Sequence, residues 1–187
     1  MTAFATVTDL EPLLGRDFTA EEQAQVEALL EAASSFLRGV IGQDVYPVTT
    51  STYTAYPSGG REDLPQWPVV SVDAVTRDSV DVSYLYRPGF IMVDSDDPVD
   101  ITFTWGLAVV PPELVRLTCV LAAQTLGAIE TTGMLSAGGL SSVAIDDFKA
   151  SFADGGAGAG MALTPQVEKS IRSQFGRGDV SFMEARW

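Results

Sequence analysis

The stretch Val99-Asp100-Ile101-Thr102-Phe103-Thr104-Trp105-Gly106 decides the fold of this 187-residue chain. Its apolar residues alternate with aspartate and threonine, which is the period of a strand with one buried face. Gly106 is expected to end the strand, and a short apolar linker leads to Pro111 and Pro112. Because the first turn of a helix leaves its N–H groups unbonded, prolines cost no hydrogen bond there, and this pair predicts the start of a helix.

The segment after the prolines is predicted to be a helix over residues 112–127. It is apolar almost all round from Leu114 to Leu126, which indicates a helix buried on most sides, in its own core or in one that a neighbouring subunit completes. The only cysteine, Cys119, is expected to be a small buried hydrophobe in this helix. The small residues at 133–139 are expected to form a loop, and residues 140–152 an extended segment.

Two helices are predicted before the strands. Residues 8–14 are typical of a short capped helix that a glycine closes. Thr19 and Glu22 have the spacing of a capping box, and they open a second helix over residues 19–41 with apolar residues at helical spacing on one face. The first half of this helix carries four glutamates: Glu21, Glu22, Glu27 and Glu31.

Between residues 45 and 105 the hydrophobic period changes to two, and turns rich in glycine and proline separate short strands, with one strand expected from Val80 to Tyr86. A short helix is predicted over residues 164–175, followed by a tail over 176–187. The sequence therefore predicts an α+β fold. We expect a small bundle of α-helices (an N-terminal helix pair, a central buried helix and a short C-terminal helix) with an inserted antiparallel β-sheet or hairpin region, forming one domain over residues 1–175.

Composition restricts the function. The chain has 11 Lys and Arg against 25 Asp and Glu, a net charge of −14, which argues against a dedicated nucleic-acid binder. The charge fits plain solubility, or a surface that DNA passes without sticking. There is no histidine, which removes the commonest general base and metal ligand. We therefore predict no catalytic residue, cofactor or metal, and we expect no signal peptide and no run of membrane-spanning length.

Four aspartates cluster around one turn: Asp94, Asp96, Asp97 and Asp100. Loops rich in carboxylate oxygens can bind Ca²⁺, but this spacing does not match the twelve-residue calcium loop and lacks its final glutamate. A solvated hairpin turn is the favoured interpretation. A metal-dependent enzyme that uses these carboxylates is the alternative from another functional class.

The C-terminal tail has a different character. Phe182, Met183 and Trp187 are large apolar residues at a chain end, after a glycine break. Exposed apolar residues mark interfaces, and aromatic anchors dominate binding energy. The tail is thus expected to dock on a partner, with folding back onto its own domain as the alternative.

Four parts of the chain follow one another in a distinctive order. They are the N-terminal helix pair, the segment Leu64-Pro65-Gln66-Trp67-Pro68-Val69-Val70-Ser71-Val72, the passage from Trp105-Gly106 to Val110-Pro111-Pro112-Glu113-Leu114, and the ending Leu163-Thr164-Pro165-Gln166-Val167-Glu168 with Arg172. Taken in this order, they resemble the head-to-tail connector (adaptor or head-completion) proteins of long-tailed bacteriophages, and the resemblance covers most of the chain.

The resemblance implies a structural virion protein. Such proteins form a homo-oligomeric ring, commonly twelvefold, at the head–tail junction of a particle made in the bacterial cytoplasm. The implied partners are the portal protein, a tail-side completion, stopper or terminator protein and further copies of the chain, without a membrane. DNA would pass the channel-facing Glu21, Glu22, Glu27 and Glu31 without specific binding. The portal would be contacted by Arg177, Phe182, Met183, Arg186 and Trp187. The alternative is another phage structural protein, such as a tail-completion or minor capsid component.

Overall fold

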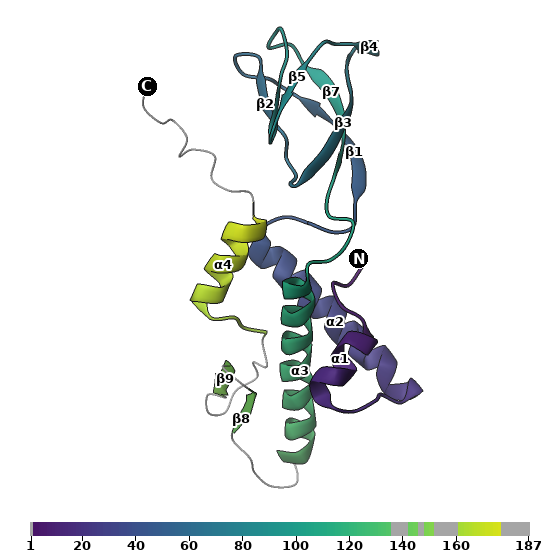
Figure 1. Ribbon diagram of the computed structural model, residues 1–187, viewed down its shortest axis with the longest axis vertical. Coiled ribbons are helices and arrows are strands. Elements are labelled where there is room, and N and C mark those ends of the chain that lie inside the picture. The colour runs from purple at the N-terminus through teal and green to yellow at the C-terminus, as the bar shows by residue number, and fades with distance from the viewer. Residues whose placement is uncertain (1, 136–141, 146–147, 152–160, 177–187) are drawn as a thin grey trace. The chain divides into compact units, whose positions relative to one another are not determined.

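The computed structural model describes residues 2–135, 142–145, 148–151 and 161–176 (Figure 1). The chain divides into two compact units, whereas one domain was expected over residues 1–175. Met1–Leu37 and Pro111–Thr164 form one, here called the helical unit; Arg38–Val110 and Pro165–Trp187 form the other, the β unit. Helices and small antiparallel sheets together confirm the α+β class.

The helical unit is built on α1 (Val7–Leu14), most of α2 (Ala20–Ile41) and α3 (Pro112–Leu135). α1 ends as predicted at Gly15, whose φ of 66° is left-handed and whose N–H donates to Glu11 O over 2.9 Å. Apolar residues of all three helices, with Ala5 before α1 and Phe18 before α2, form one core: Ala5, Leu10, Phe18, Val26, Leu30, Cys119, Ala122, Ala123 and Leu126.

α3 is buried on most sides, as predicted. From Leu114 to Ala128, Arg116 is the one exposed residue. Burial raises the pKa of the Cys119 thiol to about 11, so this side chain is a buried hydrophobe and not a reactive thiolate. The helix continues to Leu135, past the predicted end at residue 127, so the loop expected from residue 133 is wrong for its first three positions. Residues 136–139 of that loop lie outside the described residues.

The expectation of no run of membrane-spanning length is also wrong, because Pro112–Thr131 of α3 is long and apolar enough by length and composition alone. Half of this stretch is buried inside the protein, and it supplies the centre of the helical unit's core. Core burial therefore accounts for its apolar composition without a membrane.

Two small antiparallel sheets make up most of the β unit (Figure 1). The first has the strand order β1 (Thr49–Ala55), β7 (Val99–Trp105), β3 (Val69–Arg77), β4 (Val80–Asp81). The second has the order β2 (Arg61–Asp63), β6 (Phe90–Met92), β5 (Leu85–Arg87). Residues of both sheets form one core: Ala55, Leu64, Val75, Ile91, Val93, Val99, Ile101, Phe103 and Trp105.

The single strand expected from Val80 to Tyr86 is wrong. β4 pairs with β3 in the first sheet, whereas β5 pairs with β6 in the second. Alternation continues through both strands, so the sequence pattern does not reveal that the chain changes sheets between them. β2 was not predicted, because its charged triplet lacks apolar alternation and its place is set by backbone pairing with β6.

The stretch that decides the fold forms the predicted strand and turn. β7 covers Val99–Trp105, with every second residue buried. Gly106 has a φ of +104°, and a Cβ at this position would lie 2.6 Å from the carbonyl oxygen of Pro47, so the turn requires glycine. The N–H of Leu107 then donates to Val45 O over 2.8 Å, which holds the linker against the chain that precedes β1.

α4 (Pro165–Phe175) lies within the β unit, where the last turn of α2 also belongs. Arg172 Nε donates to Val40 O at 3.2 Å, and Gln43 Nε2 donates to Phe175 O at 2.7 Å. These bonds attach the short C-terminal helix to the end of α2. In the segment expected to be extended, Ser142–Ile145 (β8) and Phe148–Ser151 (β9) form an antiparallel pair.

Candidate functional site

Three of the four glutamates expected to face a channel, Glu21, Glu27 and Glu31, are exposed on α2. They have no hydrogen bond or ion pair with the part of the chain that the structure describes. The opposite side of the helix is buried through Val26, Leu30, Ala33 and Leu37. The exposed residues between the glutamates are the uncharged Gln23, Ala24, Gln25 and Ala28.

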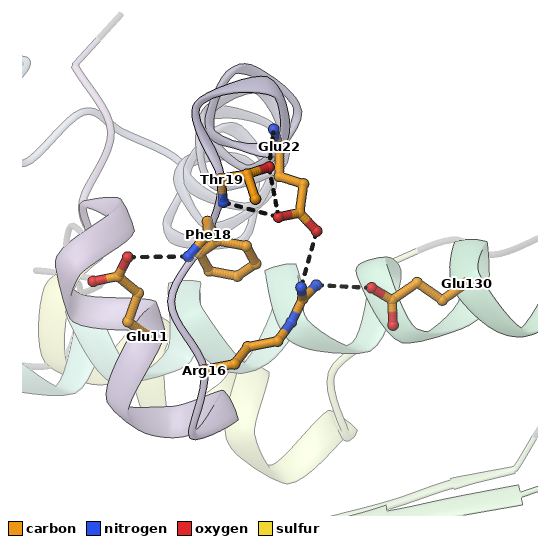
Figure 2. Close-up of polar contacts among 6 residues, drawn as sticks. All are labelled: Glu11, Arg16, Phe18, Thr19, Glu22 and Glu130. Carbon is orange, nitrogen blue, oxygen red and sulfur yellow. Dashed lines mark hydrogen bonds and ion pairs between the residues drawn. The ribbon is translucent and has the colours of Figure 1, made fainter.

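Glu22 differs from the other three because its carboxylate is held in the capping box. Thr19 N–H and the Thr19 hydroxyl both donate to Glu22 Oε2 at 2.9 Å, and Glu22 N–H donates to Thr19 Oγ1 at 3.4 Å (Figure 2). This confirms the predicted capping box. The pKa of Glu22 is lowered to about 2. The bond from the Thr19 N–H is the largest cause, followed by a hydrogen bond from Arg16 and then the bond from the Thr19 hydroxyl.

Arg16 lies between two glutamates of the helical unit, as Figure 2 shows. Its Nη1 and Nη2 each lie 2.9 Å from a carboxylate oxygen, on Glu22 and Glu130 respectively. The guanidinium carbon also lies 4.7 Å from the ring centroid of Phe18. The bond to Glu22 is the largest cause of the raised pKa of Arg16. Arg16 is therefore ion-paired with Glu22 and Glu130, whereas Glu21, Glu27 and Glu31 have no ion pair in the part of the chain that the structure describes.

Few basic side chains offset these carboxylates. In the described part of the helical unit they are Arg16, Arg116 and Lys149, and α2 itself has no basic residue before Arg38. A row of uncompensated carboxylates gives the exposed side of α2 a negative potential that repels phosphate. We call Glu21, Glu27 and Glu31, with the alanines between them, the acidic face of α2.

Each aspartate around the turn after β6 has a separate partner. The Gly60 N–H donates to Asp96 Oδ1 at 2.7 Å, and Asp94 Oδ1 lies 4.0 Å from Arg77 Nη1. The hydroxyls of Ser95 and Thr54 donate to Asp97 and Asp100. Within the described ranges no three His, Cys, Asp or Glu side chains gather as a metal site requires. The geometry is that of a hydrogen-bonded turn.

The residues expected to contact the portal, Arg177, Phe182, Met183, Arg186 and Trp187, lie outside the described residues. The last described position is Gly176, whose N–H donates to Arg172 O at 2.9 Å and closes α4. α4 is therefore complete before the tail begins.

The first sheet has a polar face that was not predicted from the sequence. Thr50 Oγ1 lies 2.8 Å from Thr104 Oγ1, and Thr52 Oγ1 lies 2.8 Å from Thr102 Oγ1. The row continues through Thr54 to Asp100 and from Thr104 to Asp73, whose pKa is lowered by hydrogen bonds from Thr104 and then Ser71. The sequence signal for this polar face is a threonine at every second position from Thr50 to Thr54. The strand was predicted from the β propensity of these threonines, and not from the shared face on which they lie.

Comparison with known proteins adds no assignment. No family model matches the chain, and a search of curated proteins finds no match.

Proposed function

We propose that this chain is a structural virion protein that forms a ring at the head–tail junction of a long-tailed phage. There it attaches to the portal, provides the platform for tail joining, and surrounds the path along which DNA passes. The observation that carries the proposal is the acidic face of α2, with its exposed and uncompensated glutamates. A wall of this charge repels the DNA backbone, so DNA slides past without binding.

The strand-to-helix passage gives a second, independent support. In the resembling family a strand, a glycine, a short linker and paired prolines precede an apolar helix. Here β7 ends at Trp105, Gly106 makes the turn that requires glycine, and α3 begins at Pro112. The order of these features is the specific part of the resemblance.

The chemistry of the described side chains favours a structural role over an enzymatic one. The chain has no histidine, and the thiol of Cys119 is buried with a raised pKa. The most acidic turn has its carboxylates bonded to the chain itself.

The test is co-sedimentation of the purified chain with the purified portal ring from the same genome, with the stoichiometry measured. A version that ends at Gly176 is the matched control, because it retains the described contacts of α4, including the bond from Gly176 N–H to Arg172 O. We expect the full chain to bind at one copy per portal subunit and the shortened chain to lose binding.

Two results would contradict the proposal in different ways. Binding by both versions would support the ring role but would overturn the assignment of portal contact to residues 177–187. Binding by neither would overturn the connector role, and a tail-completion or minor capsid protein would become the better assignment. Cryo-electron microscopy of the particle would then locate the chain directly.

A further inference from the structure

β1 has one edge that no described strand covers. The strand order of its sheet places β1 at one end, where it pairs with β7 alone (Figure 1). The pairing runs without a register shift from Thr49 opposite Trp105 to Ala55 opposite Val99. The other edge of β1 is therefore regular along its whole length and presents backbone donors and acceptors to an incoming strand.

β1 also lacks the usual defences of an edge strand. Proteins protect such edges with charged residues, proline, bulges or very short strands. The sequence Thr-Thr-Ser-Thr-Tyr-Thr-Ala is seven residues long and has no charge, proline or glycine. Pro47 and Pro57 flank the strand but lie outside it. They limit the length of the open edge without closing it.

The opposite edge of the same sheet, at β4, is protected, so β1 is the edge at which the sheet can accept another strand. There β4 is only two residues long, and Val82 N–H donates to Val75 O at 2.9 Å. The hydroxyl of Tyr84 donates to Val72 O at 3.0 Å. This side chain therefore occupies a carbonyl that could otherwise accept a hydrogen bond from an added strand. A partner strand added at β1 would thus close the sheet and not start a fibre.

The side chains of β1 indicate which strand fits. Thr50, Thr52 and Thr54 are exposed on one side of the sheet, whereas Ser51 and Tyr53 on the core side are partly buried and Ala55 is fully buried. Only an antiparallel register centred on Thr52 pairs all seven residues with a second β1. In this register Thr50 lies opposite Thr54 of the second copy, which extends the row of threonine hydroxyls across the new pair. Ser51 lies opposite Tyr53 of the second copy. Threonine pairs of this kind stabilise neighbouring strands.

The distribution of charge also favours contact between two copies at β1. The molecule carries a net charge of −14, so two copies repel each other over most of their surfaces. β1 is uncharged over its whole length, and Asp100, beside Thr54 on β7, is hydrogen-bonded to the Thr54 hydroxyl at 2.6 Å. The strand is a place where two copies can meet without placing like charges directly opposite each other.

We propose that the open edge of β1 pairs antiparallel with β1 of a second copy, which joins the two first sheets into one continuous sheet. This inference goes beyond the ring proposed above and does not rest on it. A single strand pair buries less than the ~1,200 Å² of standard interfaces, so the dimer is weak and depends on concentration.

The test compares two lysine variants of the full chain by sedimentation equilibrium over a wide concentration range. Thr52→Lys and Thr102→Lys remove the same hydroxyl pair, whose oxygens lie 2.8 Å apart, and add the same charge on the same side of the sheet. Only Thr52 is on the open edge. We expect Thr52→Lys to weaken dimerisation by about tenfold or more, because lysines would lie directly opposite each other, while Thr102→Lys stays near the wild type.

Hydrogen exchange at low and high protein concentration gives the second readout. Backbone amides of β1 in the wild type should become more protected as the concentration rises, and those of β4 should not. A wild-type chain that remains monomeric with exchange in β1 independent of concentration overturns the proposal. So does a dimer that both lysine variants weaken equally, because such a contact would not involve the edge.

Discussion

Arg16 Nη1 lies 2.9 Å from Glu22 Oε1, so the residue that caps α2 is also ion-paired. The same carboxylate accepts bonds from the N–H and hydroxyl of Thr19. The start of α2 thus depends on the ionised form of Glu22, and this dependence can be measured through pH.

Acid should weaken the fold through Glu22. Its pKa is about 2 in the folded protein against an ordinary value of 4.5, so the ionised cap stabilises the fold fully above pH 4.5 and loses that contribution as the pH falls toward 2. We expect Glu22→Gln to be less stable than the wild type at neutral pH, with the difference shrinking over this window. Urea unfolding at several pH values measures it.

Glu27→Gln is the control for that experiment, because Glu27 is exposed and has no partner in the described chain. At neutral pH, Glu27→Gln removes the same charge from α2 without removing a capping bond, so it should cost less stability than Glu22→Gln. If Glu22→Gln and the wild type keep a constant difference down to pH 2, the capping carboxylate does not stabilise the helix by its charge.

Two glycines should respond to alanine in opposite directions. Gly106→Ala places a Cβ 2.6 Å from Pro47 O at a φ of +104°, and should destabilise the protein by about 1–3 kcal/mol. Gly39 lies inside α2, where an added Cβ would meet nothing within 4 Å, so Gly39→Ala should stabilise the protein by about 1 kcal/mol. Urea midpoints measure both, and a neutral Gly106→Ala would show that the turn does not require glycine.

Cys119 should react only when the protein opens. Its side chain is 3% exposed, and burial raises its pKa to about 11, so a thiol reagent meets neither an accessible nor an ionised sulfur. We expect labelling at neutral pH to be at least about a hundredfold slower than in urea. Ser35→Cys in a Cys119→Ala background is the comparison, because Ser35 is exposed on α2 and should label rapidly. Equal rates at both positions would mean that α3 is not packed as described.

Sequence patterns predicted the elements whose burial is periodic. The helical spacing of Val26, Leu30 and Leu37 located α2, and the alternation in Val99–Trp105 gave β7 its bounds, because in both cases one buried face sets the pattern. The capping box at Thr19 was likewise local, since its partners are three residues apart.

The missed features depend on partners far away in the sequence. β2 has no apolar pattern and exists because β6 pairs with it, while the end of α3 lies beyond Glu130, which is paired with Arg16 more than a hundred residues earlier. The open edge of β1 is a property of strand order, which alternation does not encode. For the candidate site, all four glutamates could be predicted from the sequence, but the ion pair between Arg16 and Glu22, which the other three lack, could not.

Reversing the acidic face of α2 tests the channel role. Converting Glu21, Glu27 and Glu31 to lysine replaces a repulsive surface with one that attracts phosphate, and these side chains make no described contact whose loss would unfold the helix. We expect the variant to bind double-stranded DNA in a salt-dependent manner, whereas the wild type does not. Particles assembled with it should eject DNA more slowly, by about tenfold or more.

The control variant makes the same change in charge elsewhere, at the exposed Asp17, Asp81 and Glu113. If the acidic face lines the path of DNA, this control should leave ejection close to the wild-type rate even if it gains some affinity for free DNA. Equal slowing by both variants would mean that total charge matters and not its position. Normal ejection with the α2 variant would place the acidic face away from the channel, and its carboxylates would then serve solubility alone.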